Sequence, residues 1–333
     1  MARELLIGIT EAGVMHTDAD PEFDLDTKFR MVKESGVYDY FDKTPPADQA
    51  DAYMACSEKY DLPIRAGGWF YTLGADEPLL EANLRLGAKL GSKVHNTQIK
   101  LHHADGHVVT DQEVADAYLR ACEFGEQVGC VPTFEIHVNM WSEDFPRVIR
   151  VGEMVEARGA TFRMTLDHSH VIFKIDNPDE QAICNVDQAI ASGDLILDPF
   201  TPGNVSDLWI ERGWIWHAHA RAAVPNNPKN ITGRHPDGKI GRGIQYPFID
   251  PGPDGYHSPF DASRLEPWKE VIRHLFAYHA RDPEGHLGQI STEFIPPPDY
   301  GAGHRYSIFE HSIACATWLR STWQEALAKA DAA

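Results

Sequence analysis

Cysteine is scarce in this sequence, and its arrangement gives no sign of pairing. The chain has five cysteines, an odd number, and they are scattered without any C-x-x-C pair. Disulfide frameworks and thiolate zinc sites both depend on paired or closely spaced cysteines. The sequence therefore argues against both and indicates a protein of a reducing compartment.

Long apolar runs are also missing. No segment approaches the roughly 18 to 20 apolar residues that a membrane-spanning helix needs. The first residues, Met-Ala-Arg-Glu-Leu-Leu-Ile-Gly-Ile-Thr, pass directly into a strand-like run without the pattern of a signal peptide. We therefore expect a cytoplasmic protein that does not enter a membrane.

Positive charge is the third shortage. Thirty Lys and Arg residues face fifty Asp and Glu residues, which gives a formal net charge of −20. Binding to nucleic acid or to anionic lipid relies on Lys and Arg that neutralise phosphates. Neither partner is expected, and a nuclease activity is opposed by the same balance.

What the sequence does contain is a regular alternation of strand-like and helix-like segments along its 333 residues. The helical segments have apolar residues at helical spacing, and the strand segments are short apolar runs. We expect strands at 5–10, 37–41, 62–70, 93–101, 130–138, 161–166, 214–219 and 287–294. We expect helices at 27–35, 48–60, 77–90, 111–128, 143–157, 180–192, 265–280 and 307–328.

Eight strands that alternate with helices over more than 250 residues are typical of a (β/α)₈ TIM barrel. The rival, a doubly wound sheet, usually has a Gly-rich phosphate turn after its first strand, and Thr10-Glu11-Ala12-Gly13 matches that poorly. We predict an α/β protein with a single TIM-barrel domain over residues 1–333.

One segment departs from this alternation. Residues 222–263 are rich in Pro, Gly, Asn and Asp, and they follow the seventh predicted strand. Irregular segments of this length within a compact domain are usually functional. We expect an insertion over the catalytic face whose apolar groups cover an aromatic part of the substrate or contact a partner; a passive surface insertion is the alternative.

Polar side chains that can bind metal stand at four consecutive predicted strand ends. They are Glu135 on the fifth strand, Asp167 on the sixth, His217, His219 and Arg221 on one alternate face of the seventh, and Glu293 on the eighth. Active sites of TIM barrels are built at these strand ends. Carboxylates with an imidazole suit Mn²⁺, Mg²⁺ or Co²⁺ better than a thiolate-binding metal, and Zn²⁺ stays open.

Further candidates surround this set. His137 lies two residues after Glu135 on the same expected strand face, and His170 lies three residues after Asp167. Either imidazole is a candidate general base, with support of the metal ligands as the alternative role. We assign His217, Arg221, Trp69 and Asn96 to substrate binding, because amides and aromatic faces suit sugars; packing within the barrel is the alternative for Trp69.

These residues resemble the xylose-isomerase-like TIM barrel superfamily of sugar isomerases, keto-sugar epimerases and related enzymes. The resemblance rests on Glu135 with His137, Asp167-x-x-His170, the His-x-His-x-Arg run at 217–221 and Glu293, and it covers nearly the whole chain. It implies one divalent ion, Mn²⁺ first, bound by Glu135, Asp167, His219 and Glu293. The chain departs from the epimerases after His219, where Ala220-Arg221-Ala222-Ala223 stands in place of Glu-x-x-x-x-Arg.

Within this superfamily the chain is most similar to the α subunits of bacterial C-glycoside deglycosidases, through Phe134-Glu-Ile-His-Val-Asn-Met-Trp, the long seventh loop and Ile295-Pro-Pro-Pro-Asp-Tyr-Gly. This resemblance implies a metal-dependent lyase that splits the carbon–carbon bond of a 3-oxo C-glycoside, together with a small β subunit. A free-standing keto-sugar isomerase or epimerase is the alternative. A metal-binding barrel without activity is a third class.

Overall fold

The computed structural model describes residues 4–230, 233–282 and 286–332. Eight strands, each paired in parallel with both neighbours, close into one barrel in chain order, so the predicted TIM barrel is confirmed. The strands are β1 (Leu6–Thr10), β2 (Tyr40–Asp42), β3 (Ile64–Tyr71), β4 (Val94–Ile99), β5 (Val131–Glu135), β6 (Met164–Leu166), β7 (Ile215–Ala220) and β8 (Gln289–Thr292).

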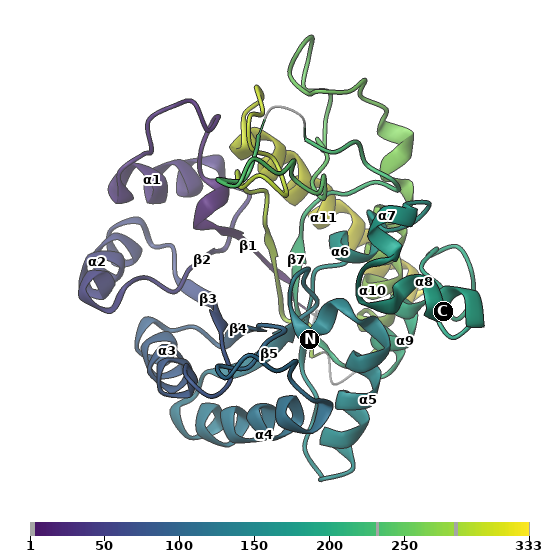
Figure 1. Ribbon diagram of the computed structural model, residues 1–333. Helices are drawn as coiled ribbons and strands as arrows, with labels where there is room; N and C mark the ends of the chain where they lie inside the picture. The colour runs from purple at the N-terminus through teal and green to yellow at the C-terminus, as the bar shows by residue number, and fades with distance from the viewer. Residues whose placement is uncertain (1–3, 231–232, 283–285, 333) are drawn as a thin grey trace.

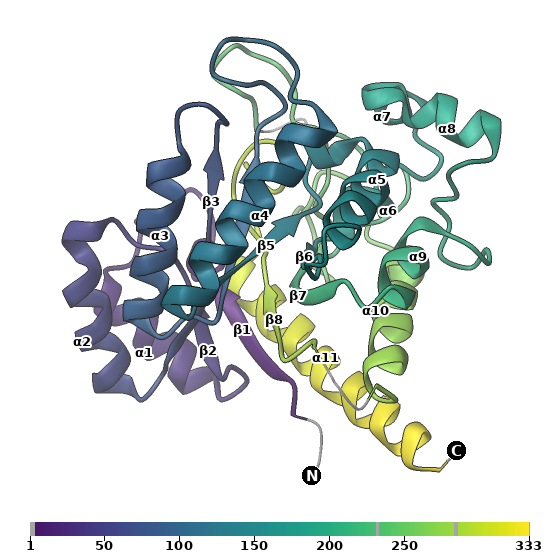
Figure 2. The same ribbon diagram turned by 90° about the horizontal axis from the view of Figure 1, so that it is seen from below.

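Helices surround the strands, as Figure 1 shows in a view onto the barrel. They are α1 (Leu25–Ser35), α2 (Ala50–Tyr60), α3 (Glu77–Leu90), α4 (Asp111–Val128), α5 (Phe145–Glu156), α6 (Ser169–Ile172), α7 (Pro178–Gln181), α8 (Val186–Ser192), α9 (Val205–Glu211), α10 (Glu266–His279) and α11 (Ile308–Asp331). The long final helix α11 packs beside β1 and β8, which closes the outer layer (Figure 2).

Local sequence signals explain the helices that were predicted best. The bounds of α3 and α4 agree with the expected ranges 77–90 and 111–128. The Thr110 side chain accepts a hydrogen bond from the Glu113 backbone nitrogen, and the Glu113 side chain accepts one from the Thr110 backbone nitrogen, which completes a capping box. Gly91 and Gly129 end the two helices in the left-handed conformation.

The sequence prediction differs from the structure in the helix expected at 180–192. That segment is broken into α7, a short 3₁₀ turn and α8, because Cys184 and Asn185 both have positive φ. The short helices α6 and α9 were not predicted, since each has too few residues to show a helical period.

The inside of the barrel is polar below the strand ends. The Thr133 and Thr165 hydroxyl oxygens lie 2.7 Å apart, and the Tyr40 hydroxyl lies 2.8 Å from that of Ser291. The Tyr40 ring fills the space beside Gly8, where any Cβ would lie 2.2 Å from the ring. Glycine at position 8 is therefore required by the close approach of Tyr40.

Residues 222–263 contain little regular structure in their described part, apart from one isolated bridge between Arg234 and Ile240 and the start of a 3₁₀ turn. Residues 231 and 232 of this segment lie outside the described residues. Across the described chain, none of the helices combines the length and the apolar character that crossing a bilayer requires.

Candidate functional site

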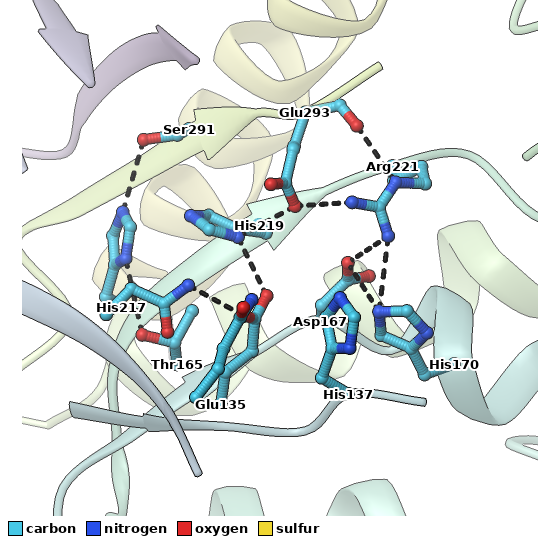
Figure 3. A network of polar contacts seen from close by, with 12 residues as sticks. Glu135, His137, Thr165, Asp167, His170, His217, His219, Arg221, Ser291 and Glu293 are labelled. Atoms are coloured by element: carbon cyan, nitrogen blue, oxygen red, sulfur yellow. Dashed lines mark hydrogen bonds and ion pairs between the residues drawn. The ribbon is translucent and has the colours of Figure 1, made fainter. Parts of the chain in front are cut away.

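Four side chains that can bind metal meet at the carboxyl ends of β5 to β8. Glu135 ends β5, His219 lies within β7, and Asp167 and Glu293 directly follow β6 and β8. One ligand atom of each lies within 4.8 Å of the others. The structure thus brings together the four residues that the sequence analysis proposed as ligands, in the arrangement that Figure 3 shows.

The His219 ring stands between two of the carboxylates. Its Nδ1 is 2.9 Å from Glu135 Oε1 and 2.8 Å from Glu293 Oε2. Burial by itself would lower the pKa of His219, but the negative charges of Glu293 and Glu135 raise that pKa well above its ordinary value. The carboxylates therefore attract a positive charge to Nδ1, either a proton or a metal ion.

Arg221 closes the other side of the cluster. Its Nη1 is 2.6 Å from Asp167 Oδ2, its Nη2 is 2.6 Å from Glu293 Oε2, and its Nε donates to the Glu293 backbone oxygen at 3.0 Å. Burial would raise the pKa of Asp167, but the charges of Arg221 and His170 outweigh it and lower the pKa. Arg221, which we assigned to substrate binding, thus also binds two of the proposed ligands.

The composition of this cluster fits a divalent cation. Three carboxylates face one guanidinium, so two negative charges remain when His219 is neutral. Glu135, Asp167 and His219 are each at most 3% exposed, and uncompensated charge at such depth costs several kcal/mol. A divalent ion would balance that charge, and oxygen donors with one imidazole and no thiolate suit Mn²⁺, Mg²⁺ or Co²⁺.

Hydrogen bonds from β4 orient the first of these ligands. Asn96 Nδ2 donates to Glu135 Oε2 at 2.7 Å, and Gln98 donates to the same oxygen. Donors of this kind around a carboxylate ligand fix its orientation toward a metal. Asn96, which we assigned to substrate binding, lines the cavity and also holds Glu135 in place.

His137 lies beyond the end of β5, so the expectation that it shares a strand face with Glu135 is wrong. The backbone leaves the barrel at this point because Ser142 forms hydrogen bonds with it in place of a neighbouring strand. The Ser142 hydroxyl donates to the Glu135 backbone oxygen at 2.6 Å and accepts from the His137 backbone nitrogen at 3.2 Å. His137 nevertheless lines the cavity over the cluster.

The hydrogen bonds of His137 define its tautomer. Its Nδ1 donates to the Val138 backbone oxygen at 2.6 Å, so its Nε2 is an acceptor, and the Tyr300 hydroxyl lies 3.0 Å from that nitrogen. Burial, helped by the charge of His170, lowers the pKa of His137 to about 4. A neutral imidazole with its acceptor nitrogen held by a phenol therefore faces the cavity.

Tyr300 was not among the predicted site residues. It lies in the segment after β8, and its ring also contacts the Arg221 guanidinium at 4.2 Å. In the sequence, the run Pro296-Pro297-Pro298-Asp299-Tyr300 contributes only to the resemblance. Its place directly after the eighth strand is the signal that could have found it.

His170 is buried behind the cluster. Its Nε2 lies 3.3 Å from Asp167 Oδ2 and 3.2 Å from Arg221 Nη1, its ring is 4.4 Å from that of His137, and it does not line the cavity. This position suits support of Asp167 and Arg221 rather than contact with a substrate.

His217 points into the barrel, below the cavity, and does not line it. Its two ring nitrogens lie 3.2 Å from the Ser291 hydroxyl and 3.5 Å from the Thr165 hydroxyl. Burial and the charge of His219 lower the pKa of His217 to about 3. The structure therefore corrects the assignment of His217 to substrate binding. His217 comes two residues before His219 on β7, so its side chain lies in the barrel interior and not at the mouth.

Asp42, at the end of β2, is a second residue that the sequence analysis missed. Its Oδ2 lies 3.5 Å from His219 Nε2, on the side of the ring that faces away from the carboxylate cluster. A carboxylate behind a metal-binding imidazole is the usual arrangement that orients such a ring. Asp42 directly follows the second predicted strand, so it has the same signal as the residues at strand ends five to eight: a carboxylate at the end of a strand.

A cavity of about 470 Å³ opens over the cluster. Trp69 and Phe70, at the end of β3, line it and remain 47% and 42% exposed, although both are large apolar side chains. Trp69 therefore does not pack within the barrel. Two adjacent exposed aromatic residues in a cavity are suited to contact the flat or apolar face of a ligand.

The described residues of segment 222–263 do not line this cavity, which corrects the expectation that the segment covers the substrate. Its apolar residues Ile244, Tyr246 and Phe248 are buried in the protein, where Phe248 packs against Trp268 and Trp318. The segment instead supports residues 295–304 from behind. The backbone nitrogens of Arg242 and Ile244 donate to Asp299, and the Gln245 amide oxygen accepts from the backbone of Ile295.

A buried group of four charges also attaches the segment to the barrel. Arg242 forms ion pairs with Glu143 and Glu180, and Lys174 lies 3.0 Å from Glu143 and 3.7 Å from Glu180. Glu143 also accepts a hydrogen bond from the backbone of Asn139, which lines the cavity. These four residues are called the Arg242 charge cluster below.

Comparison with known proteins gives a fold but no family. No protein-family model matches the sequence, and no curated protein matches it. Many solved structures resemble it in fold. A xylose isomerase domain protein from Alicyclobacillus acidocaldarius has a TM-score of 0.56 at 14% identity, covering 97% of this chain and 99% of that one.

Two others have similar scores. The apo form of 3-keto-D-glucoside 4-epimerase from E. coli has a TM-score of 0.54 at 14% identity, over 96% of this chain and 100% of that one. A xylose isomerase-like TIM barrel protein from Mycobacterium smegmatis, in complex with magnesium, has a TM-score of 0.53 at 10% identity, over 98% and 99%. The chain therefore has the xylose-isomerase-like TIM barrel fold.

Proposed function

We propose that this chain is a metal-dependent enzyme that removes the proton next to the carbonyl group of a keto sugar. In its finer form, the proposal is a lyase that cleaves the carbon–carbon bond between a 3-oxo sugar and an aromatic aglycone. The observation that carries it is the cluster of Glu135, Asp167, His219 and Glu293, which opens into a cavity with an exposed aromatic pair. The proposed cofactor is one divalent ion, Mn²⁺ first, with Mg²⁺, Co²⁺ or Zn²⁺ as alternatives.

Two of the structural comparisons support the general proposal of a metal-dependent enzyme that acts on a keto sugar. One protein of the same fold is described as an epimerase of a 3-keto-glucoside, and another was solved with magnesium. Shared fold is an analogy, so the argument for function rests on the residues of this chain.

The chemistry follows from the acidity of a carbon next to a ketone. A divalent ion held by the four ligands would act as a Lewis acid on the substrate oxygen atoms and stabilise the enolate charge. The chain itself supplies positive charge beside that position through Arg221, which is fixed by its contacts with Asp167 and Glu293. Such preorganised charge stabilises a developing anion without reorganisation.

The proposed base is His137. Its Nδ1 proton is committed to the Val138 backbone, so only Nε2 can accept a proton from the substrate. The Tyr300 hydroxyl occupies that nitrogen at 3.0 Å in the structure. A substrate that displaces this hydroxyl places its acidic C–H against Nε2 and leaves the phenol as a donor at the same point of the cavity. His170 supports Arg221 and Asp167 in this proposal.

The lyase form rests on Trp69 and Phe70. A sugar alone needs polar contacts, whereas a flat aglycone also needs apolar walls. The Phe70 and His137 rings are nearly perpendicular, with centroids 5.8 Å apart, so the aromatic pair is adjacent to the proposed base. An aglycone stacked there would leave the bond to the sugar close to the reacting carbon. We keep a small β subunit as the proposed partner and the cytoplasm as the proposed location.

The second candidate is a free-standing isomerase or epimerase of a keto sugar. It is favoured by one observation: the proposed ligands, base and phenol all come from this single chain, so proton transfer needs no residue of a partner. Epimerisation would return the proton to the other face of the carbon. Cleavage would instead break the bond between C1 and the aglycone, leave a double bond between C1 and C2 of the sugar, and deliver a proton to the released carbon of the aglycone.

The first experiment measures proton exchange. The chain alone is loaded with Mn²⁺ and incubated in D₂O with a 3-keto glucoside, and deuterium at the carbon next to the ketone is followed by NMR. We expect exchange that chelation abolishes and that Asp167→Asn reduces strongly. The matched control is Glu58→Gln, an exposed carboxylate on α2, which should exchange at the parental rate. Absence of exchange in the metal-loaded parent would refute the proposed function.

The second experiment separates lyase from epimerase. A 3-oxo C-glucoside with an aromatic aglycone is offered to the chain, alone and after co-purification from its native host. Release of the aglycone, together with a stoichiometric small second chain, supports the lyase. Inverted sugar without released aglycone in both preparations supports the epimerase and removes the β subunit from the proposal.

A further inference from the structure

A second group of metal-competent side chains lies outside the barrel site, on the loop between β4 and α4. His103, Asp105 and His107 place ligand atoms within 4.8 Å of one another. Asp105 Oδ1 is 3.1 Å from His103 Nδ1 and 2.5 Å from His107 Nδ1. The two imidazole rings stack with centroids 4.7 Å apart and an angle of 24°. Both rings therefore present Nδ1 to the same carboxylate oxygen.

Neighbouring hydrogen bonds indicate which ring nitrogens carry protons. The Asp105 backbone nitrogen donates to His103 Nδ1 at 3.3 Å, so this nitrogen has a lone pair. His107 Nε2 lies 3.0 and 3.1 Å from the two Glu113 carboxylate oxygens, so it is the nitrogen that carries the proton of a neutral ring. His107 Nδ1 is then also an acceptor.

Two imidazole nitrogens and one carboxylate oxygen therefore converge, close enough together for a single cation to contact all three. His103 Nδ1 accepts only a long hydrogen bond, at 3.3 Å, from the Asp105 backbone nitrogen, so an ion that binds this nitrogen would replace one weak contact. A cation among the three would satisfy all of them. We propose that His103, Asp105 and His107 bind a divalent transition-metal ion, and that Glu113 orients His107 toward it.

The loop holds these ligands in place before any ion binds. The His103 backbone nitrogen donates to the His107 oxygen and the Gly106 nitrogen donates to the His103 oxygen, both at 2.9 Å, which closes a tight turn. The His107 backbone nitrogen also donates to Asp105 Oδ1 at 3.2 Å. Gly74 supports the His103 ring from behind, where any Cβ would lie 2.4 Å from the ring. A preformed turn lowers the entropic cost of binding.

The ligand types select the class of metal. Two imidazoles and one carboxylate suit Zn²⁺, Co²⁺, Ni²⁺ or Cu²⁺, whereas Mg²⁺ and Ca²⁺ prefer sites made of oxygen. Glu113 beside His107 completes the carboxylate–histidine–metal arrangement that is usual in such sites. The side chains of His103, Asp105 and His107 are 25%, 64% and 41% exposed, so water would complete the coordination of an ion bound there and the ion would be exchangeable. The barrel cluster has three carboxylates and one imidazole, and therefore prefers Mn²⁺, Mg²⁺ or Co²⁺.

The test measures Zn²⁺ binding to the untagged full chain by equilibrium dialysis and elemental analysis at pH 7.5. We expect the parent to bind one more equivalent of Zn²⁺ than His103→Ala/His107→Ala. The control is His102→Ala, which removes a neighbouring histidine outside the cluster and should bind as the parent does. Equal Zn²⁺ content in the parent and the double variant at all concentrations would overturn the proposal. The cluster would then be a protonated His107 between two carboxylates.

A second variant guards against a failure of the first to fold. Glu113→Gln keeps the capping box at the start of α4, because Gln replaces Glu in that motif. Loss of an orienting carboxylate should lower the affinity for this Zn²⁺ ion about 10- to 100-fold. Unchanged affinity would overturn the proposed role of Glu113. Since neither variant touches the barrel cluster, proton exchange with Mn²⁺ should continue, and the two proposals can fail separately.

Discussion

Replacing Arg242 with methionine tests whether the irregular segment 222–263 is attached to the barrel through the Arg242 charge cluster. Methionine keeps an apolar stem beside the Phe173 ring but removes the guanidinium that pairs with Glu143 and Glu180. Lys174 then remains as the sole cation of the cluster for two buried carboxylates. Removal of one partner from a buried ion pair is strongly destabilising, because a charge is left without compensation.

The expected size follows from Glu143. Burial by itself would raise the pKa of this carboxyl, but the hydrogen bond from Arg242 and the charges of Lys174 and Arg242 lower it to about 2, from an ordinary value of 4.5. Each pKa unit corresponds to about 1.4 kcal/mol, so the pairing stabilises the folded state by about 3 kcal/mol at neutral pH. Because Lys174 keeps part of this pairing, we expect Arg242→Met to lower the melting temperature of a domain of this size by up to roughly 5 °C.

The pH dependence has a defined sign. Because the folded-state pKa of Glu143 is depressed, its stabilisation is fully present above the unfolded value near 4.5 and is lost as the pH falls toward 2. The difference in unfolding free energy between the parent and Arg242→Met should therefore be largest at neutral pH. It should shrink between pH 4.5 and pH 2.

The assay is urea unfolding followed by circular dichroism at several pH values. Arg234→Met is the matched control, since Arg234 lies on the same segment but is exposed, and among the described residues its side chain donates to the Gly238 backbone oxygen. The double variant Glu143→Gln/Arg242→Met should lose less than the sum of the two single variants. If Arg242→Met is no less stable than Arg234→Met, or if the loss is independent of pH, the reasoning is wrong.

Three further predictions concern the barrel site. Glu293→Ala and Asp167→Ala should each bind Mn²⁺ much more weakly than the parent in a competition assay, and parental affinity in both would exclude the proposed ligands. His137→Gln should lower kcat for proton exchange by roughly 10² to 10⁴ while Mn²⁺ content stays unchanged, whereas near-normal kcat would move the role of base elsewhere. Trp69→Ala should raise KM for an aromatic 3-oxo C-glucoside but leave that for a keto sugar without an aglycone unchanged, and equal effects on both would exclude an aglycone subsite at β3.

The structure also changes what a deletion within 222–263 would do. If the segment only covered an aromatic part of the substrate or contacted a partner, as the sequence predicts, shortening it between Gly233 and Gly255 would abolish activity and leave the melting transition largely intact. In the structure the same deletion removes Arg242 and the buried Tyr246, so stability should fall together with activity. A shortened chain that melts as the parent does would contradict the packing described above.

The sequence alone was sufficient for the barrel and for the four proposed ligands. Alternating apolar periods predict strands and helices, and parallel strands joined by helices have one way of closing that places all their carboxyl ends together. Glu135, Asp167, Glu293 and the pair His217 and His219 could therefore be grouped without knowing any contact between them, and the resemblance to the keto-sugar epimerases implied His219 as the ligand. Their grouping depends on the order of the strands in the barrel. The alternation of strand-like and helix-like segments indicates that order repeatedly along the whole chain.

What the tertiary structure decided depends on single turns and on distant contacts. His137 faces the cavity from beyond β5 because Ser142 forms hydrogen bonds with the backbone there. His217 lies below the mouth of the barrel because it comes two residues before His219 on the same strand. Tyr300 meets His137 across 163 residues of sequence, and Arg242 meets Glu143 across 99. No local pattern records such pairs, since they form only when the packing of separate loops brings them together. The roles of the irregular segment and of the phenol beside the proposed base therefore came from the folded chain alone.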